Sequence, residues 1–218
     1  MRLALLIDID GTLLDTLDAI LEAMNLACAD LDVGPPFRPD ELRPMIGMPV
    51  QRQLAELRSI SGPPADVFAD RYYEHFTRIV DRGVRPYPGV RETFPALADR
   101  PITTMSTRRR HEAAHMLRVA GLDSYFQTIV GGDDVPRPKP HPDLPLHGAK
   151  ALRVPPARCV VVGDSPVDIA AGRAAGMQTL AVTYGYGDRT AIREAHPDGL
   201  IERFDHLPRA LEDLEAEA

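Results

Sequence analysis

The sequence LALLIDIDGTLLDT, residues 3–16, decides the fold that we expect for this chain. It starts with five apolar residues, Leu3 to Ile7, and a short apolar run that ends in polar residues is typical of a strand buried in a parallel sheet. Asp8 and Asp10 follow, two positions apart. Because alternate residues of an extended chain point to the same side, we expect both carboxylates to face one small volume. That volume lies at the carboxyl end of the strand, where open α/β sheets bind ligands.

Two acids in so small a volume need a compensating charge. Carboxylates are rarely buried without a partner, and two of them repel each other unless a cation lies between them. A hard cation such as Mg²⁺ suits carboxylate and carbonyl oxygens. Gly11 comes next and permits a sharp turn or a close backbone approach to a ligand. The stretch therefore predicts a metal or ligand site directly after the first strand.

The composition disfavours several classes of function. With 218 residues and a net charge of −7, the chain has the size of one ordinary domain plus a smaller one, and no bulk attraction for nucleic acid or an anionic membrane. No apolar run reaches the roughly 18 residues of a membrane span, and the N-terminus enters the first strand without a signal peptide. We therefore expect a soluble, cytoplasmic protein with no nucleic-acid or membrane partner. Cys28 and Cys159 are expected to be free buried thiols.

Apolar periodicity divides the chain into two parts. Residues 16–83 contain only helical patterns and are expected to form a small helical domain inserted after the first strand. Residues 1–15 and 84–218 alternate strands with helices, which is typical of a doubly wound parallel α/β sheet. The expected helices of the insert are 16–32 (with Asp15 or Thr16 as N-cap), 39–43, 49–59 and 65–80. The later strands are expected at 102–106, 127–130, 159–162, 178–182 and 199–202, and the later helices at 88–98, 108–119, 142–153 and 165–175.

Polar residues mark the ends of two further strands. Ser106 ends the strand at 102–106, where its hydroxyl and the following backbone N–H groups can bind an oxyanion or cap the next helix. Asp164 follows the strand at 159–162 much as Asp8 follows the first. Asp168 lies one helical turn later, so its carboxylate can reach the same volume. Gly163 lets the backbone come close to that volume.

One of the two lysines of the chain lies in a proline-rich loop. Lysine occurs only at Lys139 and Lys150. Pro138 and Pro140 flank Lys139 and hold it on a stiff, extended loop. An ammonium fixed in this way is useful where the charge of several acids must be balanced. Taken alone, the pattern also fits a surface lysine.

The four segments together resemble the motifs of the haloacid dehalogenase-like phosphatases. DIDGTLLDT at 8–16 is similar to their DxDGTLxDS signature, and Ser106, KPHPD at 139–143 and GDSPVD at 163–168 follow in the family's order. The helical insert stands where the family has a mobile cap. The stretches at 87–90 and 182–187 resemble the phosphoglycolate phosphatase branch in particular. That branch usually has Thr-Asn-Lys where this chain has Ser106, Thr107 and Arg108.

The resemblance implies a Mg²⁺-dependent phosphomonoesterase that acts on a small phosphorylated metabolite, with 2-phosphoglycolate as the first expectation. It implies that Asp8 attacks phosphorus to form an aspartyl-phosphate, and that Asp10 protonates the leaving oxygen and later deprotonates water. It also implies that Asp8, Asp164 and the backbone carbonyl of Asp10 hold Mg²⁺, with Asp168 in support. The phosphate-binding residues that it implies are Gly11, Thr12, Ser106, Thr107 and Lys139, of which Ser106 and Lys139 also stabilise the transferring group. The cap would read the leaving group through residues near Gly47, and the protein would be a monomer or a homodimer.

Some alternatives stay open at this point, and others are disfavoured or ruled out. Sugar-phosphate phosphatases and phosphomutases of the same superfamily keep the paired acids, and only the fate of the phosphoryl group separates the mutases. Haloacid dehalogenases need neither Asp10 nor Asp164, and phosphonoacetaldehyde hydrolases need a cap lysine that residues 16–82 lack. A receiver-type signalling module is shorter and has no cap, and a non-enzymatic phosphate-binding or regulatory protein is disfavoured because no catalytic position is substituted. His111 and His115 match the zinc-protease pattern H-E-x-x-H but lack its extended tail.

Overall fold

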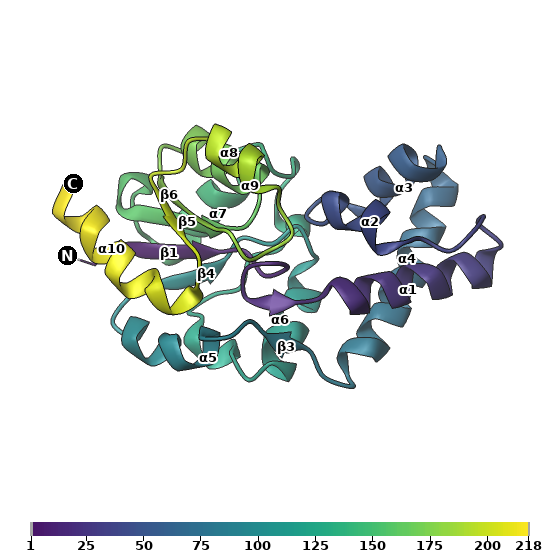
Figure 1. Ribbon diagram of the computed structural model, residues 1–218, viewed down its shortest axis with the longest axis horizontal. Coiled ribbons are helices and arrows are strands. Elements are labelled where there is room, and N and C mark those ends of the chain that lie inside the picture. The colour runs from purple at the N-terminus through teal and green to yellow at the C-terminus, as the bar shows by residue number, and fades with distance from the viewer. Residues whose placement is uncertain (1, 218) are drawn as a thin grey trace.

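Five parallel strands form the central sheet of the computed structural model, which describes residues 2–217 (Figure 1). Their order is β4-β1-β5-β6-β7, with β1 (Ala4–Ile7) between β4 (Ile102–Thr104) and β5 (Cys159–Gly163). β6 (Gln178–Val182) and β7 (Gly199–Ile201) complete the sheet. The predicted doubly wound α/β fold is therefore confirmed.

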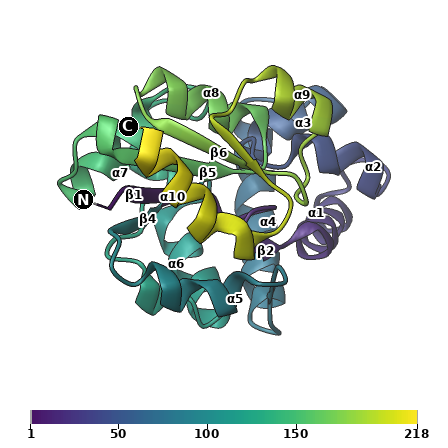
Figure 2. The ribbon, with the colours of Figure 1, turned by 60° about the vertical axis from the view of Figure 1, so that its left-hand side comes forward.

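The sheet is covered by helices on both faces, which explains why β1 is apolar throughout. Leu5 and Ile7 belong to the apolar cluster that contains residues of α5, α6 and α10, whereas Ala4 and Leu6 pack with residues of α7. Figure 2 shows α7 and α8 on one side of the strands and α5 and α6 on the other. A strand buried on both faces needs a continuous apolar run rather than an alternating one. The helices of this part are α5 (Val90–Thr93), α6 (Arg110–Val119), α7 (Asp143–Leu152), α8 (Pro166–Ala174), α9 (Arg189–Glu194) and α10 (Leu207–Glu217).

Two predicted elements differ from the structure. The segment 127–130 is not a strand but makes a single β-bridge, between Thr103 and Thr128. Two threonine side chains of β4 replace much of the expected ladder: Thr103 Oγ1 donates to Thr128 O, and Thr104 Oγ1 bonds to both O and N–H of Val130. The helix predicted at 88–98 is a short α5 that continues as a 3-10 helix, Phe94–Leu97. Pro95 has no N–H for an α-helical hydrogen bond, which accounts for the change.

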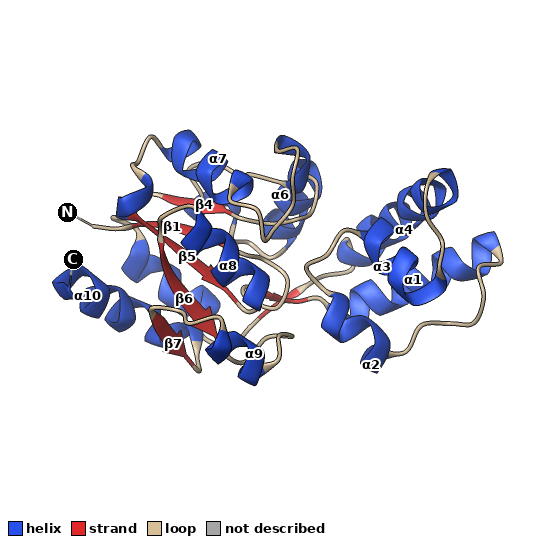
Figure 3. Ribbon diagram, turned by 90° about the horizontal axis from the view of Figure 1, so that it is seen from above, coloured by secondary structure: helices blue, strands red, loops and turns tan. Residues whose placement is uncertain are grey.

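Besides a short 3-10 helix, Arg43–Met45, the insert consists of four α-helices that lie to one side of the sheet (Figure 3). These are α1 (Leu17–Leu31), α2 (Pro39–Leu42), α3 (Val50–Arg58) and α4 (Pro63–Val80), close to the predicted helical ranges. Met24 of α1 and Phe68 of α4 are among its buried side chains. The chain enters and leaves it through two short antiparallel strands, β2 (Leu14–Asp15) and β3 (Arg85–Pro86). The two connections between the insert and the sheet part therefore lie side by side, at the end of the first motif.

Both cysteines are free and buried, as predicted. Cys28 belongs to α1, and Cys159 starts β5. Burial raises the pKa of both thiols, so neither is activated. Among residues 2–217, no helix is both long and apolar enough to cross a membrane.

The C-terminal helix is held by an ion pair between Arg100, which is buried, and Glu215, which is partly buried, and this pair gives a stability prediction. Arg100 is 3% exposed, and its Nη1 lies 2.6 Å from Glu215 Oε1, which also accepts the N–H of Leu3. Glu215→Gln leaves the guanidinium without its counter-charge and is expected to lower the free energy of unfolding by about 2 kcal/mol at pH 7. Urea denaturation at pH 7 measures the change.

The matched control is Asp99→Asn, because the Arg2–Asp99 pair is about half exposed at both ends and is expected to contribute much less to stability. Burial opposes ionisation of Glu215, but the hydrogen bonds from Arg100 and Leu3 outweigh it and lower the pKa of the carboxyl. The contribution of Glu215 is thus complete above the unfolded pKa of about 4.3 and is lost as the pH falls through the lower folded pKa. Equal losses of stability from the two substitutions at pH 7 would contradict the prediction that the Arg100–Glu215 pair contributes more than the Arg2–Asp99 pair.

Candidate active site

Three adjacent strands deliver their polar residues to one edge of the sheet. Asp8 follows β1 directly, Asp164 follows β5 directly, and Ser106 lies two residues after β4. Lys139 reaches the same edge from the loop before α7, and Asp168 lies in the first turn of α8. These residues therefore lie together at one edge of the sheet, as expected for the carboxyl ends of neighbouring parallel strands.

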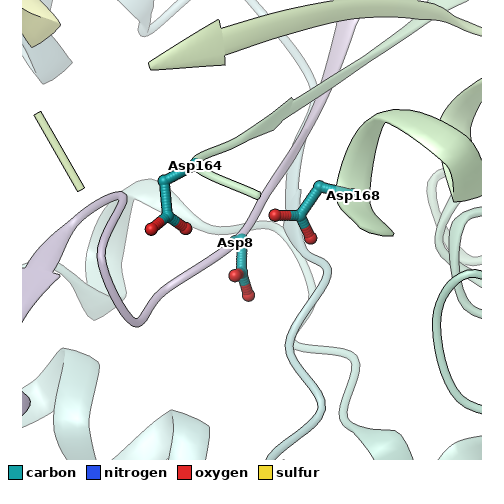
Figure 4. Close-up of side chains that lie close together, drawn as sticks. All are labelled: Asp8, Asp164 and Asp168. Atoms are coloured by element: carbon teal, nitrogen blue, oxygen red, sulfur yellow. The ribbon is translucent and has the colours of Figure 1, made fainter. Parts of the chain in front are cut away.

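Three acids form a buried group at this edge. One carboxylate oxygen from each of Asp8, Asp164 and Asp168 lies within 4.8 Å of the other two. Figure 4 shows the three side chains converging from the ends of two strands and the start of a helix. A compact set of buried carboxylate oxygens is a donor set that suits a hard cation. Across residues 2–217 this is the one group of possible metal ligands found, and it includes neither His111 nor His115.

Burial and mutual repulsion disfavour the charged forms of these acids. Burial raises the pKa of Asp8 well above its ordinary value, and the opposing charge of Lys139 does not cancel the effect. Burial and the neighbouring Asp168 raise the pKa of Asp164 to about 7, against the N–H of Tyr186 and the hydroxyl of Thr12. These two donors lie 2.7 Å from Asp164 Oδ2 and 3.3 Å from Asp164 Oδ1. A cation bound between these carboxylates would therefore favour their charged forms.

Lys139 is the cation that the chain itself supplies. Its Nζ lies 3.2 Å from Asp8 Oδ1 and 2.5 Å from Asp168 Oδ1, and it donates to the carbonyl of Met105. Burial opposes the charge of Lys139, but Asp168 and Asp8 outweigh it and raise the pKa of the ammonium. Asp168 Oδ2 accepts from the N–H and the hydroxyl of Ser165, so both oxygens of Asp168 are engaged. Ser165 is the N-cap residue of α8, and the contact of its N–H with Asp168, three residues later, is the side-chain half of a capping box.

The side chain of Asp10 does not join the acid group, contrary to the expectation that it shares a volume with Asp8. Arg108 Nε lies 2.7 Å from Asp10 Oδ2 and Arg108 Nη2 lies 2.8 Å from Asp10 Oδ1. Thr16 Oγ1 donates to Asp10 Oδ1 at 2.5 Å instead of capping α1. The expectation required an extended chain, but β1 ends at Ile7 and the chain turns at Gly11, where φ is +83°. Of Asp10, only the backbone carbonyl stays a predicted metal ligand.

The turn at Gly11 also explains why glycine is needed there. A Cβ atom on Gly11 would overlap the carboxylate of Asp164 and the ring of Tyr186. A side chain at this position would therefore push a member of the acid group aside. Thr12, the next residue, donates its hydroxyl to Asp164. The predicted phosphate-binding residues Gly11 and Thr12 thus lie against the acid group.

The loop after β4 contains the residue that sequence reasoning missed. Ser106 is buried and its Oγ accepts the N–H of Arg108. Since α6 begins at Arg110, Ser106 is not the N-cap of that helix. The branch usually has lysine where this chain has Arg108. That difference was the signal in the sequence that could have identified this residue. Its guanidinium is buried, lies 3.8 Å from the centre of the Phe76 ring and donates to Tyr72 Oη.

Tyr186 is a second residue that sequence reasoning did not single out. Its backbone N–H binds Asp164, and its hydroxyl accepts the N–H groups of Thr16 and Leu17, where the insert begins. The same hydroxyl donates to Asp15 Oδ1. One residue thus connects the acid group with the first crossing into the insert.

Two cavities lie between the insert and the sheet part. The larger, about 830 Å³, is lined by Arg43 and Met48 on the insert side and by Asp164 and Tyr186 on the other. The smaller, about 30 Å³, is lined by Asp10, Thr107 and Arg108 and by insert residues that include Gly47, Met48 and Tyr72. Residues near Gly47, expected to read a leaving group, therefore face the loops that carry the motifs. His115 Nε2 lies 2.8 Å from Asp81, away from both cavities.

Comparison with known proteins gives a consistent result. The model of the haloacid dehalogenase-like hydrolase family matches residues 5–182. A phosphoglycolate phosphatase of Cupriavidus necator is 33% identical over 95% of this chain and 92% of its own length, and the pyrophosphatase PpaX of Oceanobacillus iheyensis is 31% identical over 91% of each. Among solved structures, CbbY from Rhodobacter sphaeroides in complex with phosphate is 25% identical, with a TM-score of 0.84 over 95% of this chain and 96% of its own.

Proposed function

The chain belongs to the haloacid dehalogenase-like hydrolase family, and on that premise we propose that it hydrolyses a small phosphomonoester with Asp8 as the nucleophile. Family membership makes it an enzyme, and its relatives at about 30% identity include named phosphatases. The observation that supports the nucleophile best is the contact of Asp8 with Lys139 inside the buried acid group. A carboxylate held beside a fixed ammonium at the end of a central strand is oriented for attack on a bound phosphoryl group.

Mg²⁺ is the cofactor that fits the acid group. Three buried carboxylate oxygens lie close together, and burial with mutual repulsion raises the pKa values of Asp8 and Asp164. We propose that Asp8, Asp164 and the backbone carbonyl of Asp10 hold the ion, while Asp168 supports it, because Lys139 and Ser165 already engage both oxygens of Asp168. When bound, the ion would neutralise charge on the phosphate oxygens.

The residues of the chain account for the rest of the reaction. A carboxylate oxygen of Asp8 attacks phosphorus, the bond from phosphorus to the leaving oxygen breaks, and an aspartyl-phosphate forms. Water then attacks phosphorus, which releases inorganic phosphate and regenerates Asp8. Lys139 Nζ, the Ser106 hydroxyl and the backbone N–H groups after β4 stabilise the phosphoryl oxygens. Asp10 donates a proton to the leaving oxygen and takes one from the attacking water.

Residues 16–83 act in this proposal as a cap, and residues 1–15 and 84–218 as the catalytic core. The position of the two cavities between these parts supports the assignment. A cap that closes over the site excludes water and selects the leaving group. We take 2-phosphoglycolate as the first substrate to test, because relatives with that activity in their name match over most of the chain. Diphosphate is the second, because the similar PpaX is named a pyrophosphatase.

The test of the metal requirement is an assay of inorganic phosphate released from 2-phosphoglycolate, with Mg²⁺ or with EDTA. Removal of the ion is expected to lower the rate at least about 10²-fold, since a bound metal contributes several kcal/mol to stabilising the transition state. Re-addition of excess Mg²⁺ is the control and should restore the rate. Activity that EDTA leaves unchanged would contradict the proposal. Transfer of the phosphoryl group to a second position of a sugar phosphate, without its release, would identify a mutase instead.

A further inference from the structure

The ion pair between Arg108 and Asp10 is the feature of the site that the proposed reaction does not explain. The two side chains are 7% and 8% exposed, and the guanidinium binds both carboxylate oxygens. It also donates to Tyr72 and lies over the ring of Phe76, both from α4 of the insert. This buried, bidentate pair is the kind of contact that positions a planar carboxylate strictly.

The pair engages both oxygens of Asp10, the proposed acid–base residue. Arg108 binds both oxygens of Asp10, and Thr16 donates to one of them as well. In this arrangement Oδ1 of Asp10 accepts two hydrogen bonds and Oδ2 accepts one, so both oxygens are held by Arg108. For Asp10 to act, Arg108 must release at least one of its oxygens. A buried guanidinium is costly to leave without a counter-charge, so the release requires another anion in the place of Asp10.

The small cavity beside the pair is where that anion can bind. Asp10 and Arg108 both line it, and its volume of about 30 Å³ admits only a few non-hydrogen atoms. Gln53 lines it too, and Gln53 Oε1 is buried without a hydrogen-bond partner within the described part of the chain. An unpartnered buried acceptor is completed by a donor such as water, so the group beside the cavity that can bind an anion is Arg108. The cavity is therefore small, has polar as well as apolar walls, and lies next to a cation.

We propose that Arg108 binds the carboxylate of a small acidic leaving group and gives up Asp10 in exchange. This inference rests on the proposed function and deepens it, because it names the residue that selects the substrate class. The guanidinium already holds a carboxylate in the two-point geometry that a substrate carboxylate would adopt. An ester without a second anion cannot make the exchange and leaves Asp10 bound to Arg108. Arg108 thus couples recognition of the leaving group to the release of the proton donor.

The experiment compares two substrates that differ in one group, 2-phosphoglycolate and 2-hydroxyethyl phosphate, in which a hydroxymethyl group replaces the carboxylate. In Arg108→Gln, kcat/KM for 2-phosphoglycolate is expected to fall about 10²-fold, because two charge-assisted hydrogen bonds are lost. The value for 2-hydroxyethyl phosphate should change less than about tenfold, since that ester never gains those bonds. Arg108→Lys keeps the charge, loses the two-point geometry and should lie between.

Arg109→Gln is the matched control. Arg109 also joins the sheet part to α4, through Asp70 and the ring of Tyr73, but it does not line the small cavity. Its removal should change the two kcat/KM values by the same small factor. If Arg108→Gln lowers both values equally, Arg108 only connects the two parts and the proposal is wrong.

Two further measurements keep the test independent of folding defects and of the proposed function. Calorimetry with the Asp8→Asn protein should show that 2-phosphoglycolate binds more tightly than 2-hydroxyethyl phosphate, and that adding Arg108→Gln removes the difference. In the wild-type enzyme, kcat/KM should favour 2-phosphoglycolate more than tenfold, and a ratio near one would overturn the inference without any Arg108 variant. Hydrolysis of neither ester by the wild type would instead count against the proposed function itself.

Discussion

Asp8→Asn is expected to lower kcat for phosphate release by at least about 10³-fold while leaving the protein as stable as the wild type, or more so. The amide keeps the shape of the side chain but is not a nucleophile toward phosphorus. Burial raises the pKa of Asp8, so its charged form is costly in the folded protein without metal. Lys139 Nζ also lies 2.5 Å from Asp168 Oδ1, so we expect the ammonium to stay paired when Asp8 loses its charge. Steady-state kinetics and urea denaturation without Mg²⁺ measure the two effects.

A substitution that lowers activity without lowering stability identifies a nucleophile rather than an acid that stabilises the fold. Glu112→Gln is the matched control, because Glu112 of α6 is also buried and burial raises the pKa of its carboxyl. It lies outside the acid group, so its substitution should change kcat less than about twofold, as is usual for residues that do not touch the reacting atoms. An Asp8→Asn enzyme that retains kcat would show that another residue attacks phosphorus.

The acid group was predictable because each of its residues follows from a local pattern. Asp8 and Asp164 end apolar runs, and the carboxyl ends of adjacent parallel strands converge whatever the loops between them do. Asp168 lies one helical turn after Asp164, so its direction is fixed by the helix. Patterns of period two or 3.6 were sufficient here because the chain keeps its regular geometry up to the site.

The orientation of Asp10 and the role of Arg108 were not predictable in this way. The pattern of period two does not apply after Ile7, where the strand ends and the chain starts to turn. The partner of Asp10 lies 98 residues further along the chain, and no local pattern relates the two positions. The segment 127–130 shows the same limit, because the threonine side chains of β4 bind its backbone in place of a ladder. In each case a side chain distant in sequence competes with the local preference.

Lys139→Met is expected to lower the free energy of unfolding by about 3–5 kcal/mol in the absence of Mg²⁺ and to abolish most of the activity. The Lys139 side chain is 1% exposed and lies between Asp8 and Asp168, so methionine would leave two buried carboxylates without their cation. Lys150→Met is the matched control. Lys150 is the other lysine of the chain and is exposed, so its substitution should change stability by less than about 0.5 kcal/mol.

Mg²⁺ and a second substitution identify the cause of the loss. If uncompensated charge destabilises Lys139→Met, Mg²⁺ should raise its urea midpoint more than that of the wild type, because the ion then replaces the missing ammonium. Lys139→Met combined with Asp168→Asn should be more stable than Lys139→Met alone, since the second change removes one of the orphaned charges. Losses that simply add, and that Mg²⁺ does not affect, would mean that Lys139 stabilises the fold by packing. Recovery in both experiments would instead establish that charge balance in the acid group is what Lys139 supplies.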